Sequence, residues 1–395
     1  MSERVAILGA TGFVGSALTE YLLDKTDLTP IPFAHGTGSA TRLAHRRLEM
    51  PRIDLLDRQG VHAALRGIEY VVNCSRGGKQ LMLDGLDNLV SASRNARVKK
   101  FVHLSSVAVY GDPPHPASTS ESAPAEPAPE SYGAMKLLQD ERVQRAASKG
   151  LPTVILCPPN ITGPYSEYLL DIINSAESGR FRLLDGGNRQ INIVDVNNLS
   201  ACIVAALRSE ISDGRRMFAC EPANVTWRDL CAELQPVMRG DGAIASMSAD
   251  EFAAGLPGTS SQSASAFRMR GMLRHLVSSD VREALRGHPA WAAIEGTAKA
   301  GVRSLGKRTE NYLRQAFDGP IKVPQARIEE AIDYNLVAQQ LRGVKHDPSR
   351  SHQELGFQPP LSFSESMESF RRWYKTHLDV GSAEWELLGR AVSGW

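Results

Sequence analysis

Short apolar runs alternate with helical patterns through the first half of the chain. The strand-like runs cover residues 4–8, 29–34, 69–74, 100–104 and 153–157, and helical spacing appears over residues 13–23, 82–96 and 132–147. This alternation predicts an α/β fold, a doubly wound parallel sheet wrapped by helices. Right-handed crossovers bring the carboxyl ends of such strands to one edge, where ligands bind. We therefore expect the chemistry-bearing residues to gather at that edge.

The second half of the chain is less regular. Residues 191–207 form a short strand-like run that leads through Asp195 into a helix, and from Gly240 to Asp347 only helical patterns appear. Residues 111–131 are dense in Pro, Ala, Ser and Glu, which predicts a surface loop, either a substrate lid or a spacer. We expect a dinucleotide-binding domain over residues 1–160, rejoined at about 190–220, and a smaller helix-rich substrate domain over residues 161–395.

A glycine-rich turn joins the first strand to the first helix. Residues without a Cβ let backbone N–H groups and the helix N-terminus approach a pyrophosphate. Glycine spacing alone is weak evidence, but the strand–turn–helix context favours a dinucleotide site over a purely structural turn. The cofactor-binding residues expected here are Gly9, Thr11, Gly12, Phe13, Val14 and Gly15.

The residues after the second strand bear on the choice between NAD and NADP. A carboxylate there would bind the ribose 2′-hydroxyl of NAD, and a basic group would accept the 2′-phosphate of NADP. The sequence has His35, then Arg42, and no acid between them, which leans slightly towards NADP, although both fit ordinary surface positions equally well. Asp54 follows a presumed third strand, and we expect it either to bind the adenine amino group or to cap a helix.

Two residues spaced four apart carry the candidate proton chemistry. On a helix, Tyr132 and Lys136 share one face. A phenol has an unperturbed pKa near 10, so ionising it at neutral pH costs about 4 kcal/mol. A neighbouring ammonium and a positive nicotinamide ring favour the phenolate, so we expect the pKa of Tyr132 to fall. The same spacing is also common on ordinary amphipathic helices.

Hydroxyl groups follow the buried run 100–104, at the expected ligand edge. Ser106 is expected to donate to a substrate oxygen while Tyr132 exchanges its proton. Alternatively, Ser105 and Ser106 only satisfy backbone groups at the end of the strand.

Together these motifs resemble the extended short-chain dehydrogenases/reductases, often called the NAD-dependent epimerase/dehydratase family. The resemblance covers the first half of the chain and returns near residue 194 and over 354–359. The residues that carry it are Gly9, Gly12, Gly15, Asp54, Ser105, Ser106, Tyr110, Gly111, Tyr132, Lys136, Val194 and Asp195. The resemblance implies a Rossmann fold, a bound NAD or NADP, and hydride transfer between a substrate carbon and the nicotinamide.

The resemblance also implies residue roles. Tyr132 would be the catalytic acid/base, Ser106 would hold the reacting oxygen, and Lys136 would bind the nicotinamide ribose and lower the pKa of Tyr132. The further cofactor contacts that it implies are His35, Leu55, Cys74, Ser75 and Pro159, and the further substrate contacts are Val107, Asn160 and Arg189.

The sequence departs from the family pattern at several positions. Met82 stands where Asn is frequent, and residues 73–75 replace a commoner His-x-Ala-Ala segment. Val107 and Ala108 follow Ser106, where nucleotide-sugar dehydratases have an Asp-Glu pair. Without that pair, water elimination lacks its general acid and base, so a dehydratase is disfavoured.

Charge and cysteine usage narrow the partners and the compartment. With 45 basic and 44 acidic residues the net charge is +1. The chain therefore lacks an overall positive electrostatic field that would attract nucleic acid. The five cysteines form no Cys-x-x-Cys pair, and no apolar segment is long enough to cross a bilayer, so we expect a cytoplasmic protein without a metal site. Residues 240–344 are rich in Arg and Lys, which suits a lid over a diphosphate, peripheral membrane contact or a solvated face.

The expected reaction is oxidation of a secondary alcohol or reduction of a ketone, and the family resemblance implies a nucleotide-linked sugar as the substrate. When both steps occur on one bound sugar, the net outcome is epimerisation. The first alternative is a net NADPH-dependent reductase of a sugar or another small carbonyl compound. The second is a nonenzymatic cofactor-sensing or binding module. A homodimer is expected by the resemblance, through a four-helix contact that uses the helices at 82–96 and 132–147.

Overall fold

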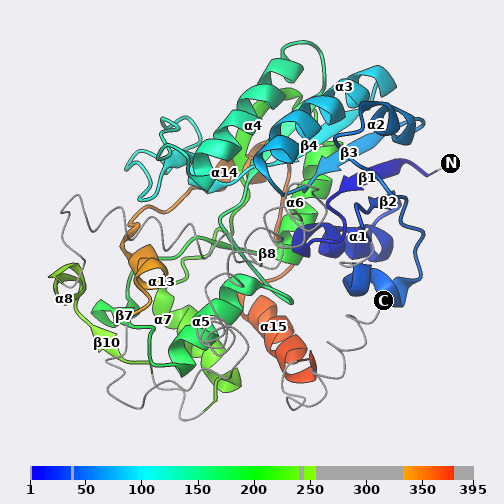
Figure 1. The fold of residues 1–395 in the computed structure, drawn as a ribbon. Helices are drawn as coiled ribbons and strands as arrows, with labels where there is room; N and C mark the ends of the chain where they lie inside the picture. Colours follow the sequence, from blue (N-terminus) through cyan, green and yellow to red (C-terminus); the bar gives the residue numbers. More distant parts are fainter. Residues whose placement is uncertain (1, 37–39, 240–243, 255–331, 378–395) are drawn as a thin grey trace, which may run out of the picture. The chain divides into compact units, whose positions relative to one another are not determined.

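The computed structural model describes residues 2–36, 40–239, 244–254 and 332–377 (Figure 1). Residues Met1–Ala249 and Ile332–Trp395 make up one compact unit, and Asp250–Ala331 make up another. The fold and the site described below belong to the first unit. Most of the basic segment expected at 240–344 lies outside the described residues.

Six parallel strands form the central sheet. In spatial order they are β2 (Thr29–Phe33), β1 (Arg4–Leu8), β3 (Tyr70–Asn73), β4 (Lys100–Leu104), β5 (Thr153–Cys157) and β9 (Asp213–Phe218). The chain steps from β1 to β2 on one side and then places β3 on the other side of β1. Strand order therefore reverses between β1 and β3, which opens a crevice at their carboxyl ends. The doubly wound parallel sheet is confirmed.

Helices cover both faces of this sheet. One face carries α2 (Arg58–Ala64), α3 (Leu86–Ala96) and α4 (Tyr132–Ala147), and the other carries α1 (Phe13–Lys25) and α6 (Val196–Arg208). Along β1, Ala6 and Leu8 face the first group while Val5 and Ile7 face the second. Both sets are fully buried, which explains the uninterrupted apolar run over residues 5–8 of β1.

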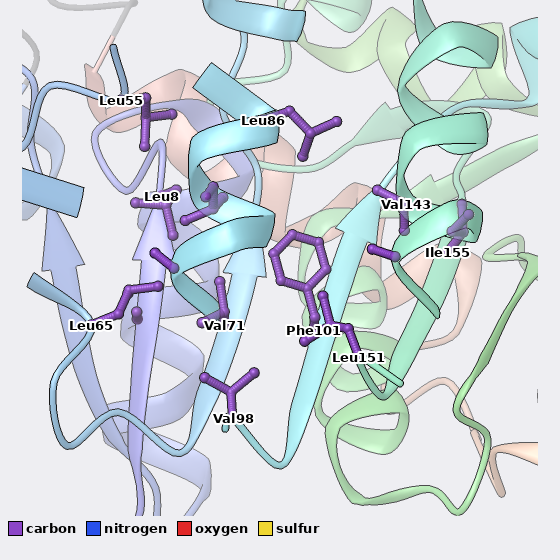
Figure 2. Close-up of a cluster of buried hydrophobic side chains, with 14 of the residues drawn as sticks. Leu8, Leu55, Leu65, Val71, Leu86, Val98, Phe101, Val143, Leu151 and Ile155 are labelled. Atoms are coloured by element: carbon purple, nitrogen blue, oxygen red, sulfur yellow. The ribbon is translucent and has the colours of Figure 1, made fainter. Parts of the chain in front are cut away.

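Figure 2 shows the core beneath α3 and α4. Phe101 of β4 lies at its centre between Val71 of β3 and Ile155 of β5, and Val143 of α4 packs over the same strands. Full burial of one such side chain contributes about 1.5–3 kcal/mol. This packing fixes α4 against the sheet and so fixes where its first residue lies.

The remaining elements lie between β5 and β9 in the chain or after β9. Two strand pairs, β6 (Asn160–Thr162) with β8 (Ile193–Asp195) and β7 (Leu183–Leu184) with β10 (Ser246–Met247), are parallel. The helices are α5 (Glu167–Glu177), α7 (Trp227–Leu234), α8 (Ala249–Ala254), α13 (Tyr334–Ala338), α14 (Ser349–Glu354) and α15 (Phe363–His377). The expectation of helical structure alone past residue 240 is wrong at β10, a strand too short to show a period of two.

Shorter turns of helix complete the fold. They are η1 (Ala40–Arg46), the π-helical turn η2 (Leu81–Gly85), η3 (Val107–Tyr110), η4 (Asp185–Gly187), η5 (Gln235–Val237) and η6 (Gln339–Leu341). The helix expected at 82–96 therefore opens with a π-turn. Its freed Met82 carbonyl accepts a hydrogen bond of 2.7 Å from Gln139 Nε2 on α4.

The loop over residues 111–131 contains turns and no helix, as expected. Glu121 anchors it twice, because its carbonyl accepts from the Tyr110 hydroxyl and its carboxylate from the Phe218 N–H of β9. A ring nitrogen of His346 lies 2.6 Å from the Ser118 carbonyl. These contacts hold the loop against the rest of the protein. A spacer without a fixed position would not need such contacts.

Among the helices in the described ranges, none has the length and apolarity needed to span a bilayer. All five cysteines are unpaired; Cys74 is half-buried and the other four are buried.

Candidate active site

The turn after β1 meets the loop after β3 at the sheet crevice. A Cβ on Gly9, which has a φ of +81°, would lie 2.8 Å from the Cys74 carbonyl oxygen, and one on Gly15 would lie 2.2 Å from the Gly9 carbonyl oxygen. Side chains cannot approach backbone so closely, so both positions require glycine. Thr11, Phe13 and Val14 are half-buried around the turn.

The same turn leaves the start of α1 open. Gly12 is its N-cap, and no side chain caps the first N–H groups of this 13-residue helix. Unsatisfied N–H groups at a helix N-terminus, reached by a glycine backbone, suit an anion. These residues fit the pyrophosphate of a dinucleotide.

Sequence reasoning missed the basic residue at the end of β2. Arg52 Nε donates to the His35 carbonyl over 3.1 Å, and Arg52 pairs with Ala34 in an isolated bridge. The Arg42 guanidinium lies elsewhere, 5.2 Å from the centre of the Tyr165 ring. His35 and Arg52 are both exposed, and they lie where the group on the ribose 2′ position of the cofactor would bind.

The segment after Arg52 differs from expectation. The presumed third strand is only that isolated bridge, and Asp57 rather than Asp54 caps α2, through Gln59 N and Gly60 N. Asp54 is exposed, and its carboxylate accepts from Leu56 N over 2.9 Å. Leu55 is buried in the core shown in Figure 2, so its side chain serves packing.

A short helix follows β4 and packs on the start of α4. Ser106 caps η3, its hydroxyl accepting from Ala108 N over 3.2 Å, and Val107 N donates to the Pro158 carbonyl. A Cβ on Gly133 would lie 2.1 Å from the Ala108 carbonyl oxygen, so only glycine permits this approach. The contact brings Tyr132 next to the end of β4 that carries Ser106. Capping by Ser106 agrees with the alternative in which the serines satisfy backbone groups.

Tyr132 begins α4 and is 45% exposed. The Arg76 guanidinium carbon lies 5.2 Å from the centre of its ring, and Lys136 Nζ lies 6.0 Å away. Partial desolvation raises the pKa of the phenol above its ordinary value, Arg76 opposes this, and Asp140 adds to it. The expected lowering by Lys136 is therefore not seen in this structure. The cation that acts on Tyr132 is Arg76, which the sequence did not single out.

Lys136 lies one turn along α4, beneath Tyr132. Its side chain is buried, and Nζ donates over 2.8 Å to the Leu104 carbonyl at the end of β4. Burial lowers the pKa of Lys136 to about 8, against the opposing effect of Asp140. The ammonium is thus fixed to the sheet edge and titrates close to neutral pH.

A buried polar network continues from this pair. Asp140, another turn along α4, accepts from Arg216 Nε of β9 over 2.6 Å, and its other oxygen lies 3.9 Å from His103 Nε2. His103 Nδ1 is 3.2 Å from Asn73 Nδ2. Burial lowers the pKa of His103 well below its ordinary value. Asp140 could have been found from sequence, because it continues the four-residue spacing of Tyr132 and Lys136.

The loop after β3 is tied to this network. Ser75 donates from both its N–H and its hydroxyl to Asn73 Oδ1, the hydroxyl over 2.6 Å. Cys74 N donates to the Leu8 carbonyl, and burial raises the pKa of the Cys74 thiol to about 12, so it stays protonated. Cys74 and Ser75 therefore line the crevice beside the glycine turn.

Two predicted contacts bond to the protein itself, and a third is buried. Asn160 Nδ2 donates to Gln339 Oε1 over 3.2 Å, and Arg189 Nη2 to Asp185 Oδ2 over 3.1 Å. Pro159 is buried between β5 and β6. Their cofactor and substrate roles stay predictions.

Comparison with known proteins gives relatives of several activities. Over 212 residues, 26% are identical to the human sterol-4-alpha-carboxylate 3-dehydrogenase, decarboxylating, covering 49% of this chain and 54% of the relative. Over 225 residues, 25% are identical to an Escherichia coli O157:H7 N-acetyl-alpha-D-glucosaminyl-diphospho-ditrans,octacis-undecaprenol 4-epimerase, covering 53% and 64%. The chain spans about half the length of the first curated relatives it matches.

A solved structure agrees in fold. UDP-glucuronic acid 4-epimerase from Bacillus cereus, in complex with NAD, superimposes with a TM-score of 0.61 over 94% of this chain and 99% of that one. At 15% identity, this likeness shows the fold alone. The model of the NAD dependent epimerase/dehydratase family matches residues 5–219, from β1 to the end of β9. The chain therefore belongs to the NAD dependent epimerase/dehydratase family.

Proposed function

We propose that this chain catalyses reversible oxidation of a secondary alcohol, or reduction of the corresponding ketone, with Tyr132 as the proton donor and acceptor. The observation that carries the proposal is the position of Tyr132. Its accessible phenol ring lies 5.2 Å from the Arg76 guanidinium carbon and 6.0 Å from Lys136 Nζ, at the ligand edge of the sheet. A protein that only bound a cofactor would not need an accessible phenol beside two cations there.

Each residue of the site has a separate role in the proposed reaction. A bound nicotinamide supplies or accepts the hydride. Ser106 orients the reacting oxygen, and Tyr132 exchanges a proton with it. Arg76 supplies positive charge that favours the phenolate, and Lys136, held by the Leu104 carbonyl, would bind the nicotinamide ribose. The open start of α1 would hold the pyrophosphate.

We propose a nucleotide-linked sugar as the substrate. The relative from Escherichia coli O157:H7 is named for a sugar diphosphate, and the Bacillus cereus structure for a UDP-sugar acid. Oxidation and re-reduction on one bound sugar would amount to epimerisation. The substrate part would be built from the elements after residue 160, and the protein would pair through α3 and α4, where Leu138 is an exposed apolar side chain.

A net NADPH-dependent ketone reductase is the second candidate. Arg52 and His35 at the end of β2 favour it, because they offer a cation where a 2′-phosphate would lie. A net reductase releases its oxidised cofactor after each turnover, whereas an epimerase recycles it in place.

The test is to identify any nicotinamide released when the purified protein is denatured, and then to titrate the stripped protein with NAD, NADH, NADP and NADPH. Tightly held NAD supports the epimerase. An empty site that prefers NADPH supports the reductase. If the protein binds none of the four nucleotides, both enzymatic proposals are overturned and the nonenzymatic module becomes the favoured alternative.

Tyr132→Phe tests the proposed acid/base. Turnover is expected to fall by about 10²–10⁴-fold, because the transferable proton is lost while the ring remains. Cofactor affinity, measured by titration, should change less than about twofold. Unchanged turnover would remove Tyr132 from the mechanism.

A further inference from the structure

Asp140 is a buried carboxylate to which the proposed reaction gives no role. It lies on α4 one turn beyond Lys136, and its side chain is fully buried. Burial raises the pKa of Asp140, and Arg216 of β9 opposes this through an ion pair of 2.6 Å between Arg216 Nε and Asp140 Oδ2. A buried carboxylate keeps its charge only where cations and hydrogen bonds offset the loss of water. The ion pair with Arg216 therefore favours an ionised Asp140 beneath α4.

Lys136 and Asp140 cross the same gap between α4 and β4. Lys136 Nζ donates over 2.8 Å to the carbonyl of Leu104, and Asp140 Oδ1 lies 3.9 Å from Nε2 of His103, the residue before Leu104. Side chains four residues apart on a helix are neighbours on one face. The ammonium and the carboxylate are therefore neighbours between the helix and the strand, and each acts electrostatically on the other.

The other titratable groups around Lys136 carry no negative charge at neutral pH. In the described part of the chain they are His103 of β4, Cys74 and Arg76 after β3, Cys157 of β5 and Tyr132 of α4. Burial keeps His103 neutral, and it raises the pKa of both thiols and of the Tyr132 phenol. Arg76 adds a charge of the same sign as Lys136. Among these described neighbours, the counter-charge of Lys136 is thus Asp140.

We infer that Asp140, anchored by Arg216, is a positioning residue that keeps Lys136 charged and in place beside Tyr132. The inference rests on the proposed function, in which Lys136 binds the nicotinamide ribose. Two cations, Arg216 and Lys136, share this one carboxylate, so it stabilises the ammonium only in part. Such partial stabilisation agrees with the Lys136 pKa of about 8, below its ordinary value of 10.5.

Denaturant unfolding of the full chain at a series of pH values tests the inference. Lys136 is compared with Lys136→Met in two backgrounds, wild type and Asp140→Asn. In wild type, the stability from Lys136 starts to rise near pH 8, its folded-state pKa. In Asp140→Asn the rise is expected to start lower by about one pH unit or more, because loss of a nearby opposite charge lowers the folded-state pKa further.

Two further variants separate charge from packing. Glu141→Gln makes the same change from carboxylate to amide at the next, exposed position of α4, and the rise should stay near pH 8. Asp140→Glu keeps the charge, so its rise should start closer to that of wild type than the rise in Asp140→Asn does.

Titration with NAD gives a second measurement. The affinity of wild type for NAD is expected to decline as Lys136 loses its proton, and in Asp140→Asn this decline should move to lower pH by the same amount as the unfolding profile. A purely structural role of Asp140 would instead lower the affinity equally at every pH.

A rise that still starts near pH 8 in Asp140→Asn would overturn the inference, and so would an equal displacement in Glu141→Gln. If Asp140→Asn does not fold, its double variant with Lys136→Met decides, since removal of both charges should restore folding. Failure of the double variant to fold would show that Asp140 is needed without Lys136. If Tyr132→Phe leaves turnover unchanged while the titration of Lys136 depends on Asp140, the proposed acid/base fails and the counter-charge stands.

Discussion

Single glycines set the geometry of the cofactor turn. The sequence indicated glycine at positions 9, 12 and 15, and the structure gives the reason at two of them, where a Cβ would meet backbone. Residue-scale contacts of the charged side chains were less predictable. Arg76 and Arg52 reach their partners across loops, and no local pattern encodes where a long side chain from a loop will point.

Gly15→Ala tests the turn. At this position the steric clash and the helix propensity of alanine change the unfolding free energy in opposite directions. Alanine within a helix normally gains up to about 1 kcal/mol over glycine. A Cβ at 2.2 Å from the Gly9 carbonyl oxygen instead forces the turn apart, so unfolding free energy should fall by about 1–3 kcal/mol and NAD affinity at least tenfold.

Gly78→Ala is the matched control, since in the described part of the chain no atom lies within 4 Å of its Cβ position. Denaturant unfolding and cofactor titration of both variants provide the measurement. A Gly15→Ala protein more stable than wild type would refute the described turn.

At the scale of elements, α4 organises the site. Tyr132, Lys136 and Asp140 occupy successive turns of one helix face, at its exposed start, at the edge of β4 and beside β9. The first five strands of the central sheet and this helix were predictable to within a residue or two, because apolar runs and helical spacing are local signals. The sixth strand, β9, was not predicted, because its sequence carries charged residues at Asp213, Arg215 and Arg216. The π-turn of η2 was not, since it depends on the bond from Gln139 to Met82.

The buried Lys136 predicts how stability depends on pH. Its folded-state pKa of about 8 lies below its ordinary value of 10.5. Between these values the unfolded chain binds more protons, so stability from this group rises with pH and its cost is fully present below pH 8. The unfolding free energy of wild type relative to Lys136→Met should therefore rise by about 1.4 kcal/mol per pH unit in that window.

Chemical denaturation at a series of pH values measures this difference, and subtraction of the variant removes the titration of other groups. Lys149→Met, at an exposed position beyond α4, is the control for the loss of a lysine from the surface. A pH-independent difference for Lys136→Met would contradict a buried, charged Lys136.

At the scale of the whole molecule, residues 361–366 return to the region of β8 and α6. Asn198 of α6 bonds to both the N–H and the carbonyl of Leu361 and to Glu221, and Ser366 of α15 donates to Asp195. Sequence reasoning placed Asp195 and the terminal run in one family pattern but not in contact. Contacts between residues so far apart in sequence depend on tertiary packing, which periodicity does not report.

Asn198→Ala tests this junction. Asn198 is fully buried, and its loss removes the bonds to both Leu361 backbone groups and one of the two bonds to Glu221 Oε1, so the unfolding free energy should fall by about 2–4 kcal/mol. Asn95→Ala on the exposed surface of α3 should change it by less than about 0.5 kcal/mol. Thermal and denaturant unfolding would measure both, and equal effects would show that the junction adds nothing.

The most direct test of the central claim is a spectroscopic titration of the Tyr132 phenol, taken as the difference between wild type and Tyr132→Phe at saturating cofactor. With oxidised cofactor, the ring charge joins Arg76 and Lys136, so the pKa of Tyr132 should fall below its ordinary value of 10, and reduced cofactor should reverse the fall. A phenol whose pKa stays at or above 10 with saturating oxidised cofactor would contradict Tyr132 as the acid/base of this site.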